Sequence, residues 1–422
     1  MGDTLRLRLA RIRWWFARRP ATTRALRRFR LVTVLRTALA PQFARLRTRL
    51  TEPSGFAAIG LRGLMRALRG VGRVEHSTPA AFPQDTDGRI RSLGPVPEHG
   101  VGGRRLRRLR RAGGVRLDHP APSAETVIAL ARAGVVLQAG EDLALPGVEP
   151  ELAATIRDIV DPADHDAREL QSVRLRRLGW GSGRATPSVS VLLASRRPDD
   201  LLHAVSMVEA QRGCDVQLCV GLHGDAWSPT IDAEISAIFS GPVVIERFAD
   251  DVDLGSMLRS LAERADGRYL SKWDDDDLYG SSHLFDLVLA HDYSGADLVG
   301  KGAEFVYLEE SDRTIRRFAI GAERPAVTLA GGSLLLERER LAGLGGWPTA
   351  VKGADQRLID AVLADGGVSY RTHGFQFILR RRPTQQAGGH TWAANDGYFL
   401  ADAVDSRPGL DLAYADIVPP AV

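Results

Sequence analysis

Short apolar stretches alternate with helical patterns from Ser188 onward, and this alternation is the feature that most constrains the fold. It predicts strands over 189–194, 216–220, 243–245 and 269–273, and helices over 201–211, 231–239 and 254–265. Alternating strands and helices are typical of a parallel sheet with helices on both faces. The sequence therefore predicts an α/β domain beyond residue 188.

Four consecutive aspartates, Asp274 to Asp277, follow the predicted strand over 269–273. Adjacent carboxylates repel one another, and the burial of an apolar core does not require them. A divalent cation would make the cluster favourable, because Mg²⁺ and Mn²⁺ prefer carboxylate oxygens. The carboxyl end of a strand is also where open α/β sheets bind their ligands. The alternative is a solvated acidic loop, or a helix N-terminus whose dipole stabilises the charges.

A separate acidic residue, Asp355, begins a second candidate element. Four apolar residues at helical spacing follow it, so it lies in the first turn of an amphipathic helix that ends at Gly366–Gly367. The helix dipole stabilises an ionised carboxylate there, and an ionised carboxylate can accept a proton. Ordinary charge complementation at a helix N-terminus is the alternative.

A histidine lies among small and basic residues near the end of the chain. His390 follows Gly388–Gly389 and comes shortly after the basic cluster Arg380 to Arg382. A histidine in this setting could bind a metal ion or a diphosphate. A single histidine is also often a structural residue.

The N-terminal part of the chain is strongly basic. Residues 1–115 contain 26 arginines and six acidic residues, although the whole chain has a net charge of only +4. Within 1–74 the pattern predicts basic amphipathic helices, the first with Leu5, Leu9, Ile12 and Phe16 on one face. Such helices suit an anionic membrane surface, here through residues 1–50, or packing against protein. No apolar run long enough for a membrane span or a secretory signal is present.

The residues between the basic region and the α/β domain predict a linker and a small module. Residues 75–114 are rich in Pro and Gly and contain the arginine cluster Arg104–Arg111. This cluster lacks interleaved aromatic residues, so nucleic acid is not an expected partner. Residues 115–180 predict a small α/β or helical module without recognisable chemistry, and 401–422 predict a C-terminal tail. The two cysteines, Cys214 and Cys219, suit a reducing compartment.

Three segments together resemble the family 2 glycosyltransferases of the GT-A fold. They are Ser195 to Asp199 after the first strand, the run Asp274–Asp277, and the pair Gly345–Trp347 with Gly353–Asp355. The resemblance covers about residues 186–400. Three segments also resemble an actinobacterial branch of that family. They are Lys272–Tyr279, Gly389–Trp392 and the upstream segment Arg168–Arg177.

This resemblance implies a mixed, mostly parallel sheet and an inverting sugar transfer from a nucleotide-diphosphate sugar to a hydroxyl acceptor. The matching positions imply that Asp355 is the catalytic base. They imply that Mn²⁺ or Mg²⁺ is held by Asp274 and Asp276, with Asp277 and His390 as further ligands. Gly331–Ser333 match a turn near the acceptor pocket. The residues expected to contact the donor are Ser195, Arg196, Asp225, Lys272, Asp274, Asp275, Lys301 and Gly332.

Two positions depart from the family pattern. The family commonly has Asn where this chain has Arg196, and arginine suits a diphosphate. The aspartate that commonly ends the second strand is absent here or displaced to Asp225. The donor nucleotide therefore stays open between UDP, dTDP and GDP.

Two other functions remain open from the sequence. A sugar-phosphate nucleotidyltransferase would share the sheet and the acidic metal ligands, but its first loop would be glycine-rich. A non-catalytic scaffold would use the arginine-rich front and leave the aspartates without a role. For the glycosyltransferase we expect a cytoplasmic protein, peripheral on the inner face of the plasma membrane. Its acceptor would be a glycan or a lipid-linked glycan of the cell envelope.

Overall fold

The structure is a computed structural model that describes residues 89–93, 103–181, 185–317, 321–350, 353–383 and 395–418. The predicted basic helices within 1–74 lie outside the described residues, as does His390. None of the described helices has the length and apolar composition that crossing a bilayer requires.

The larger sheet has eight strands in the order β12-β14-β9-β13-β7-β4-β5-β6. The neighbours β6, β5, β4 and β7 are parallel, as are β9 and β14, whereas β13 runs antiparallel to both β7 and β9. This confirms the predicted mixed, mostly parallel sheet. The strands are β4 Ser188–Ser195, β5 Asp215–His223, β6 Val243–Phe248, β7 Tyr269–Trp273, β9 Leu298–Gly300, β12 Arg324–Pro325, β13 Leu334–Glu337 and β14 Ser369–Arg371.

Helices cover both faces of this sheet because neighbouring strand residues point to opposite faces. In β4, Leu193 belongs to the apolar cluster that includes α8 and α11, whereas Leu192 belongs to the cluster that includes α10 and α13. The helices of the first cluster are α8 Pro198–Glu209, α9 Ile231–Ile238 and α11 His283–Ser294. Those of the second are α10 Leu254–Glu263, α12 Arg338–Gly343 and α13 Ala354–Ala364.

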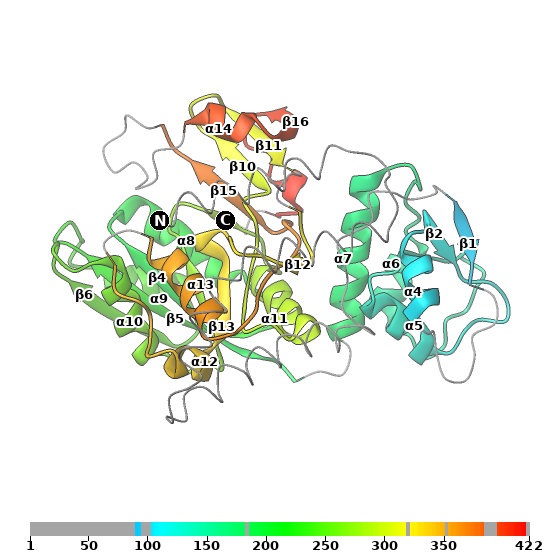
Figure 1. The fold of residues 1–422 in the computed structure, drawn as a ribbon, viewed down its shortest axis with the longest axis horizontal. Helices are drawn as coiled ribbons and strands as arrows, with labels where there is room; N and C mark the ends of the chain where they lie inside the picture. Colours follow the sequence, from blue (N-terminus) through cyan, green and yellow to red (C-terminus); the bar gives the residue numbers. More distant parts are fainter. Residues whose placement is uncertain are drawn as a thin grey trace, which may run out of the picture. The chain divides into compact units, whose positions relative to one another are not determined.

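A second sheet has the order β16-β11-β10-β15-β8. Its strands are β8 Leu278–Tyr279, β10 Phe305–Leu308, β11 Arg313–Arg317, β15 Phe377–Arg381 and β16 Ala403–Pro408. The residues predicted as a C-terminal tail thus contain a strand, β16, which pairs antiparallel with β11. Helix α14, Asp396–Leu400, lies beside these strands in Figure 1, and its Phe399 packs against their apolar residues.

The upstream module contains a three-stranded parallel sheet with its own apolar core. Two of its elements, β1 Ile90–Ser92 and α4 Gly103–Arg110, fall within the residues predicted as a linker. They belong to the module because β1 pairs with β2, Gly114–Arg116, and because Leu109 of α4 is buried in the module core. The remaining elements are β3 Leu137–Gln138, α5 Ala124–Arg132, α6 Pro150–Arg157 and α7 His165–Gly181.

Helix α7 contacts the α/β domain through buried ion pairs. The Arg176 guanidinium lies 2.7 Å from Glu323, and Arg177 lies 2.8 Å from Asp286. Buried carboxylates need such partners, because an unpaired charge in a protein interior is costly. The segment Arg168–Arg177 therefore connects the module to the α/β domain. This is the upstream segment that contributes to the family resemblance.

Candidate active site

The candidate site lies at the carboxyl ends of the parallel strands. Ser195 ends β4, His223 ends β5, and Asp274 follows the last residue of β7. Because these strands are parallel, the three positions share one edge of the sheet. The aspartate run then leads directly into β8, so it connects the larger sheet to the second sheet.

A buried lysine joins the two acidic elements. Lys272 Nζ lies 2.6 Å from Asp274 Oδ1 and 3.2 Å from Asp355 Oδ2. Only 2% of the Lys272 side chain is exposed, whereas 26% of the Asp355 side chain is exposed. Asp355 lies in the first turn of α13, after Gly353 in the left-handed conformation at φ 71°. The structure therefore brings together two carboxylates that are about eighty residues apart in sequence.

A glycine turn forms another side of the site. The turn η1, Gly331–Ser333, immediately precedes β13, whose Leu334 pairs with Lys272. A Cβ on Gly332 would lie 2.6 Å from Asp277 Oδ2 and 2.9 Å from Asp274 Oδ2, and one on Gly331 would collide with Asp355 Oδ2. The close approach of three carboxylates explains why both positions are glycine.

Tyr279 connects the aspartate run to this turn through hydrogen bonds. Its hydroxyl accepts a hydrogen bond from the Asp274 backbone N–H at 2.9 Å and donates one to the Gly332 carbonyl at 2.9 Å. Its ring stacks on Trp273 with centroids 3.8 Å apart. Sequence reasoning missed this role, because an aromatic residue in a short strand reads as ordinary core.

Arg197 neutralises the middle of the aspartate run. Its guanidinium donates to both oxygens of Asp275 and, at 2.8 Å, to Asp276 Oδ2. The Ser195 hydroxyl also donates to Asp275. Ser195 therefore lies in the site, but its side chain is buried and its hydroxyl contacts Asp275. Sequence reasoning did not single out Arg197.

Arg196 and Asp225, which were also predicted to contact the donor, lie at the same edge of the sheet. Arg196 Nη2 lies 3.1 Å from His223 Nδ1, and His223 Nε2 lies 3.2 Å from the Asp250 carbonyl oxygen. Asp225 is exposed after β5. The structure therefore places Arg196 and Asp225 near the carboxyl end of β5, away from the hydrogen bonds of the aspartate run.

Lys301 has a different environment from the one predicted. Its ammonium is buried and lies 3.4 Å from Asp286 Oδ2, with the carbonyl oxygens of His373 and Phe375 at 3.3 and 2.8 Å. Burial lowers the pKa of Lys301 to about 8, although Asp286 counteracts the shift. The side chain has no exposed surface for a phosphate, so the prediction of a donor contact at Lys301 is corrected to a structural role.

Burial and the repulsion of neighbouring carboxylates raise the pKa values of Asp355 and Asp277. For Asp355, burial raises the pKa, the Lys272 ammonium opposes the shift, and the charge of Asp274 adds to it. For Asp277, burial and then the charges of Asp274 and Asp276 raise the pKa well above its ordinary value. Lys272 shows the opposite balance. Burial lowers its pKa, but Asp274 and Asp355 more than compensate and raise it.

The oxygens of the site fit a hard divalent cation. Asp277 Oδ2 is buried without a hydrogen-bond partner, and it faces Gly332 together with Asp274 Oδ2. Two nearby carboxylates with one unsatisfied buried oxygen are the ligand type that Mg²⁺ and Mn²⁺ prefer. Within the described part of the chain, no group of three or more His, Cys, Asp and Glu residues is arranged to hold an ion.

Several solved glycosyltransferases are similar to this chain. The mannosyltransferase PcManGT from Pyrobaculum calidifontis, in complex with GDP-Man and Mn²⁺, is 13% identical with a TM-score of 0.38 over 48% of this chain and 59% of its own. S. aureus TarS 1–349 with UDP-GlcNAc is 12% identical with a TM-score of 0.36, over 54% of this chain and 69% of its own. GalNAc-T7 with UDP, GalNAc and Mn²⁺ is 14% identical with a TM-score of 0.38, over 49% of this chain and 46% of its own. No protein-family model and no curated protein matches the sequence.

Proposed function

We propose that this protein is a metal-dependent, inverting glycosyltransferase that moves a sugar from a nucleotide-diphosphate sugar to a hydroxyl acceptor. The observation that carries the proposal is the contact of Lys272 with both Asp274 and Asp355. This contact brings Asp274 and Asp355 together at one edge of an α/β sheet, where such sheets bind ligands, and it supports their assignment as cation ligand and base.

The aspartate run would hold the cation. Asp274 and Asp277 offer the oxygens that face Gly332, and Asp276 lies beside them with one oxygen bonded to Arg197. When bound, Mn²⁺ or Mg²⁺ neutralises the negative charge of the departing diphosphate. Lys272 holds Asp274, Arg197 holds Asp275 and Asp276, and the Arg380 backbone N–H bonds to Asp277, so little reorganisation is needed when the donor binds.

Asp355 would act as the general base. Its Oδ2 is held by Lys272, whereas its buried Oδ1 has no hydrogen-bond partner. Oδ1 takes the proton of the acceptor hydroxyl while the hydroxyl oxygen bonds to the anomeric carbon. The bond between that carbon and the diphosphate oxygen breaks on the opposite side, and the diphosphate takes the electron pair. The raised pKa of Asp355 makes it a better proton acceptor than an exposed aspartate.

Finer assignments rest on the sequence alone. The family 2 membership is supported by the resemblance of 186–400. Its actinobacterial branch is supported by the segments Lys272–Tyr279, Gly389–Trp392 and Arg168–Arg177. A glycan or lipid-linked acceptor of the cell envelope, and a cytoplasmic location on the inner membrane face, are supported by the basic pattern of residues 1–50.

A donor screen tests the proposal. The purified chain is heated with UDP, dTDP or GDP, each with and without Mn²⁺, since a ligand that binds the folded state raises the unfolding temperature. We expect one nucleotide to stabilise the protein in the presence of Mn²⁺, and the corresponding nucleotide sugar to release nucleoside diphosphate. Release of pyrophosphate from a nucleoside triphosphate and a sugar phosphate would instead identify a nucleotidyltransferase. No binding and no turnover would favour the scaffold.

A further inference from the structure

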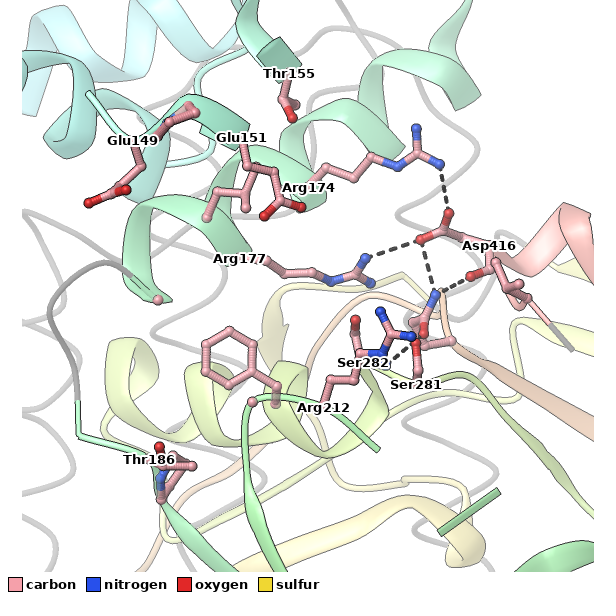
Figure 2. A pocket seen from close by; sticks show the side chains of 18 of the residues that line it. Glu149, Glu151, Thr155, Arg174, Arg177, Thr186, Arg212, Ser281, Ser282 and Asp416 are labelled. Atoms are coloured by element: carbon pink, nitrogen blue, oxygen red, sulfur yellow. Dashed lines mark hydrogen bonds and ion pairs between the residues drawn. The ribbon is translucent and has the colours of Figure 1, made fainter. Parts of the chain in front are cut away.

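A cavity of about 920 Å³ lies between α6, α7 and the N-terminus of α11. Figure 2 shows Arg174 and Arg177 reaching across it from α7 to Asp416. We propose that this groove binds a neutral glycan, and that it holds a distal part of a long acceptor chain. The assignment to an acceptor rests on the proposed function, whereas the binding of glycan does not.

The groove is separate from the candidate active site. It is lined by Pro187, which precedes β4, and by Gly213, which precedes β5. The aspartate run follows the opposite, carboxyl end of β7, which is parallel to β4. With eight residues at about 3.3 Å each, β4 separates the two edges by about 26 Å. Only a chain of several sugars could occupy both places.

The charges of the groove select against a strongly charged ligand. Its lining contains three basic and three acidic side chains, namely Arg174, Arg177, Arg212, Glu149, Glu151 and Asp416. Asp416 is already bonded to Arg174 at 2.8 Å and to Arg177 at 3.1 Å. Arg177 is also paired with Asp286 at 2.8 Å, so two carboxylates balance the two arginines in a prearranged polar wall.

The remaining polar groups suit hydroxyl-rich ligands. Among the described residues, no ion pair is formed by Arg212, Glu149 or Glu151, and all three are exposed. Guanidinium and carboxylate groups are planar and can each bond two neighbouring hydroxyls of a sugar. Carboxylates accept from hydroxyls and a guanidinium donates to them. These side chains therefore supply both hydrogen-bonding directions that a sugar needs.

An aromatic ring supplies the apolar part of the groove. Phe285 is half-buried, and two glycines lie against its ring. A Cβ would lie 3.0 Å from the ring at Gly213 and 3.8 Å from it at Gly181, so side chains there would cover more of the ring. Sugars carry an apolar C–H face that packs on aromatic rings while their hydroxyls meet polar groups. Specific small-molecule sites commonly combine an apolar surface with a few such polar groups.

A glycan array of neutral and anionic oligosaccharides, probed with the full chain, tests the inference. We expect capture of neutral glycans, with longer chains bound more tightly than disaccharides. The best neutral hexasaccharide is then titrated calorimetrically against the double variant Arg212→Ala/Glu151→Ala. We expect binding at least tenfold weaker than in the wild type. The matched control is Arg111→Ala/Glu263→Ala, which removes one exposed charge of each sign outside the groove lining.

Three results would overturn the inference. They are capture of anionic glycans alone, capture of no glycan, or equal affinity in the groove variant and its control. Asp355→Asn separates the inference from the proposed function, because hexasaccharide binding in the groove should persist in that variant. Glycan binding without any nucleotide-sugar turnover would reject the proposed function alone. Turnover with no loss of glycan affinity in the groove variant would reject this inference alone.

Discussion

The ammonium of Lys272 contacts both acidic elements, so its charge influences the pKa of the proposed base. Burial and Asp274 raise the pKa of Asp355, and Lys272 opposes them. Asp355 must be ionised to accept a proton, which means that activity falls as the pH drops through its pKa. The acidic limb of the pH profile therefore reports on the contact between Lys272 and Asp355.

Lys272→Met should shift that acidic limb to higher pH. The variant removes the positive charge that favours the ionised carboxylate, so the pKa of Asp355 rises further. Loss of a hydrogen bond to a charged group, worth about 1.5–3 kcal/mol, predicts a fall in kcat/KM of about 10- to 100-fold, largest at acid pH. The measurement is kcat/KM as a function of pH. Lys272→Arg keeps the charge and should retain the wild-type limb, and an unshifted limb in Lys272→Met would contradict the assignment.

Arg197→Met should destabilise the protein most strongly in the absence of Mn²⁺. The side chains of Asp275 and Asp276 are only 3% and 6% exposed, and both buried carboxylates lose the positive charge and hydrogen bonds of Arg197. Loss of one partner of a buried pair costs about 3–5 kcal/mol. Mn²⁺ should recover part of this loss, so its stabilising effect in thermal unfolding should exceed that in the wild type. Arg196→Met is the matched control, because Arg196 contacts His223 instead. Equal behaviour of the two variants would refute the role of Arg197.

The sequence singles out Asp274, Asp276 and Asp355 as candidates because their chemistry is unusual in their context. It could not distinguish Arg196 from Arg197, since the direction of each side chain depends on how β4 turns into α8. Lys301 was misjudged for a related reason. A lysine in sequence does not reveal whether it faces a ligand or a buried carboxylate such as Asp286.

The register between β7 and β13 brings the glycine turn to the aspartates. Leu334 pairs with Lys272, so Gly332, two residues earlier, lies beside Asp274. The strand β13 runs antiparallel within an otherwise parallel neighbourhood. That reversal allows the start of β13 to meet the end of β7.

Gly332→Ala should weaken Mn²⁺ binding and transfer. The added Cβ would lie 2.6 Å from Asp277 Oδ2 and 2.8 Å from the Tyr279 hydroxyl, so the carboxylates must move. We expect a fall in transfer of about 100-fold, because a displacement of about 1 Å at a catalytic group can cost that much. Gly343→Ala, with no atom within 4 Å of its Cβ, is the control and should be neutral. Mn²⁺ affinity, measured by electron paramagnetic resonance titration, would be the same in both variants if the turn had no role.

Two arginines of α7 should differ greatly in their effect on stability. Arg177→Met leaves Asp286 buried at 1% exposure, and loss of such a partner costs about 3–5 kcal/mol. Arg174→Met removes a side chain that is 45% exposed, whose ion pair is worth at most about 1 kcal/mol. Despite burial, Arg177, His373 and Lys301 hold the pKa of Asp286 well below its ordinary value. The two variants should therefore differ most in their free energy of unfolding at pH 7, and this difference should decrease only at strongly acid pH. Urea unfolding of both variants provides the measurement, and equal losses would argue against the buried pair.

At the scale of the whole molecule, the candidate site lies where the two sheets join. The aspartate run leaves β7 of the larger sheet and enters β8 of the second sheet. Sequence periodicity predicted the strands β4 to β7 and the helices between them, because apolar runs alternate there with helical patterns. It did not predict β1 or β16, because neither strand is an apolar run and each is defined by its non-local pairing, with β2 or β11. The presence of two sheets could likewise not be predicted from local sequence patterns.

The most direct test of the account is single-turnover transfer in Asp355→Asn, with the donor found in the screen and Mn²⁺ both bound. Asparagine preserves size and can still accept a hydrogen bond from Lys272, but it cannot take a proton from a hydroxyl. We predict Mn²⁺ and nucleotide affinities close to those of the wild type and a transfer rate constant lower by about 10²- to 10⁴-fold. A rate constant equal to that of the wild type would contradict the claim that the aspartate run and Asp355 form one catalytic site.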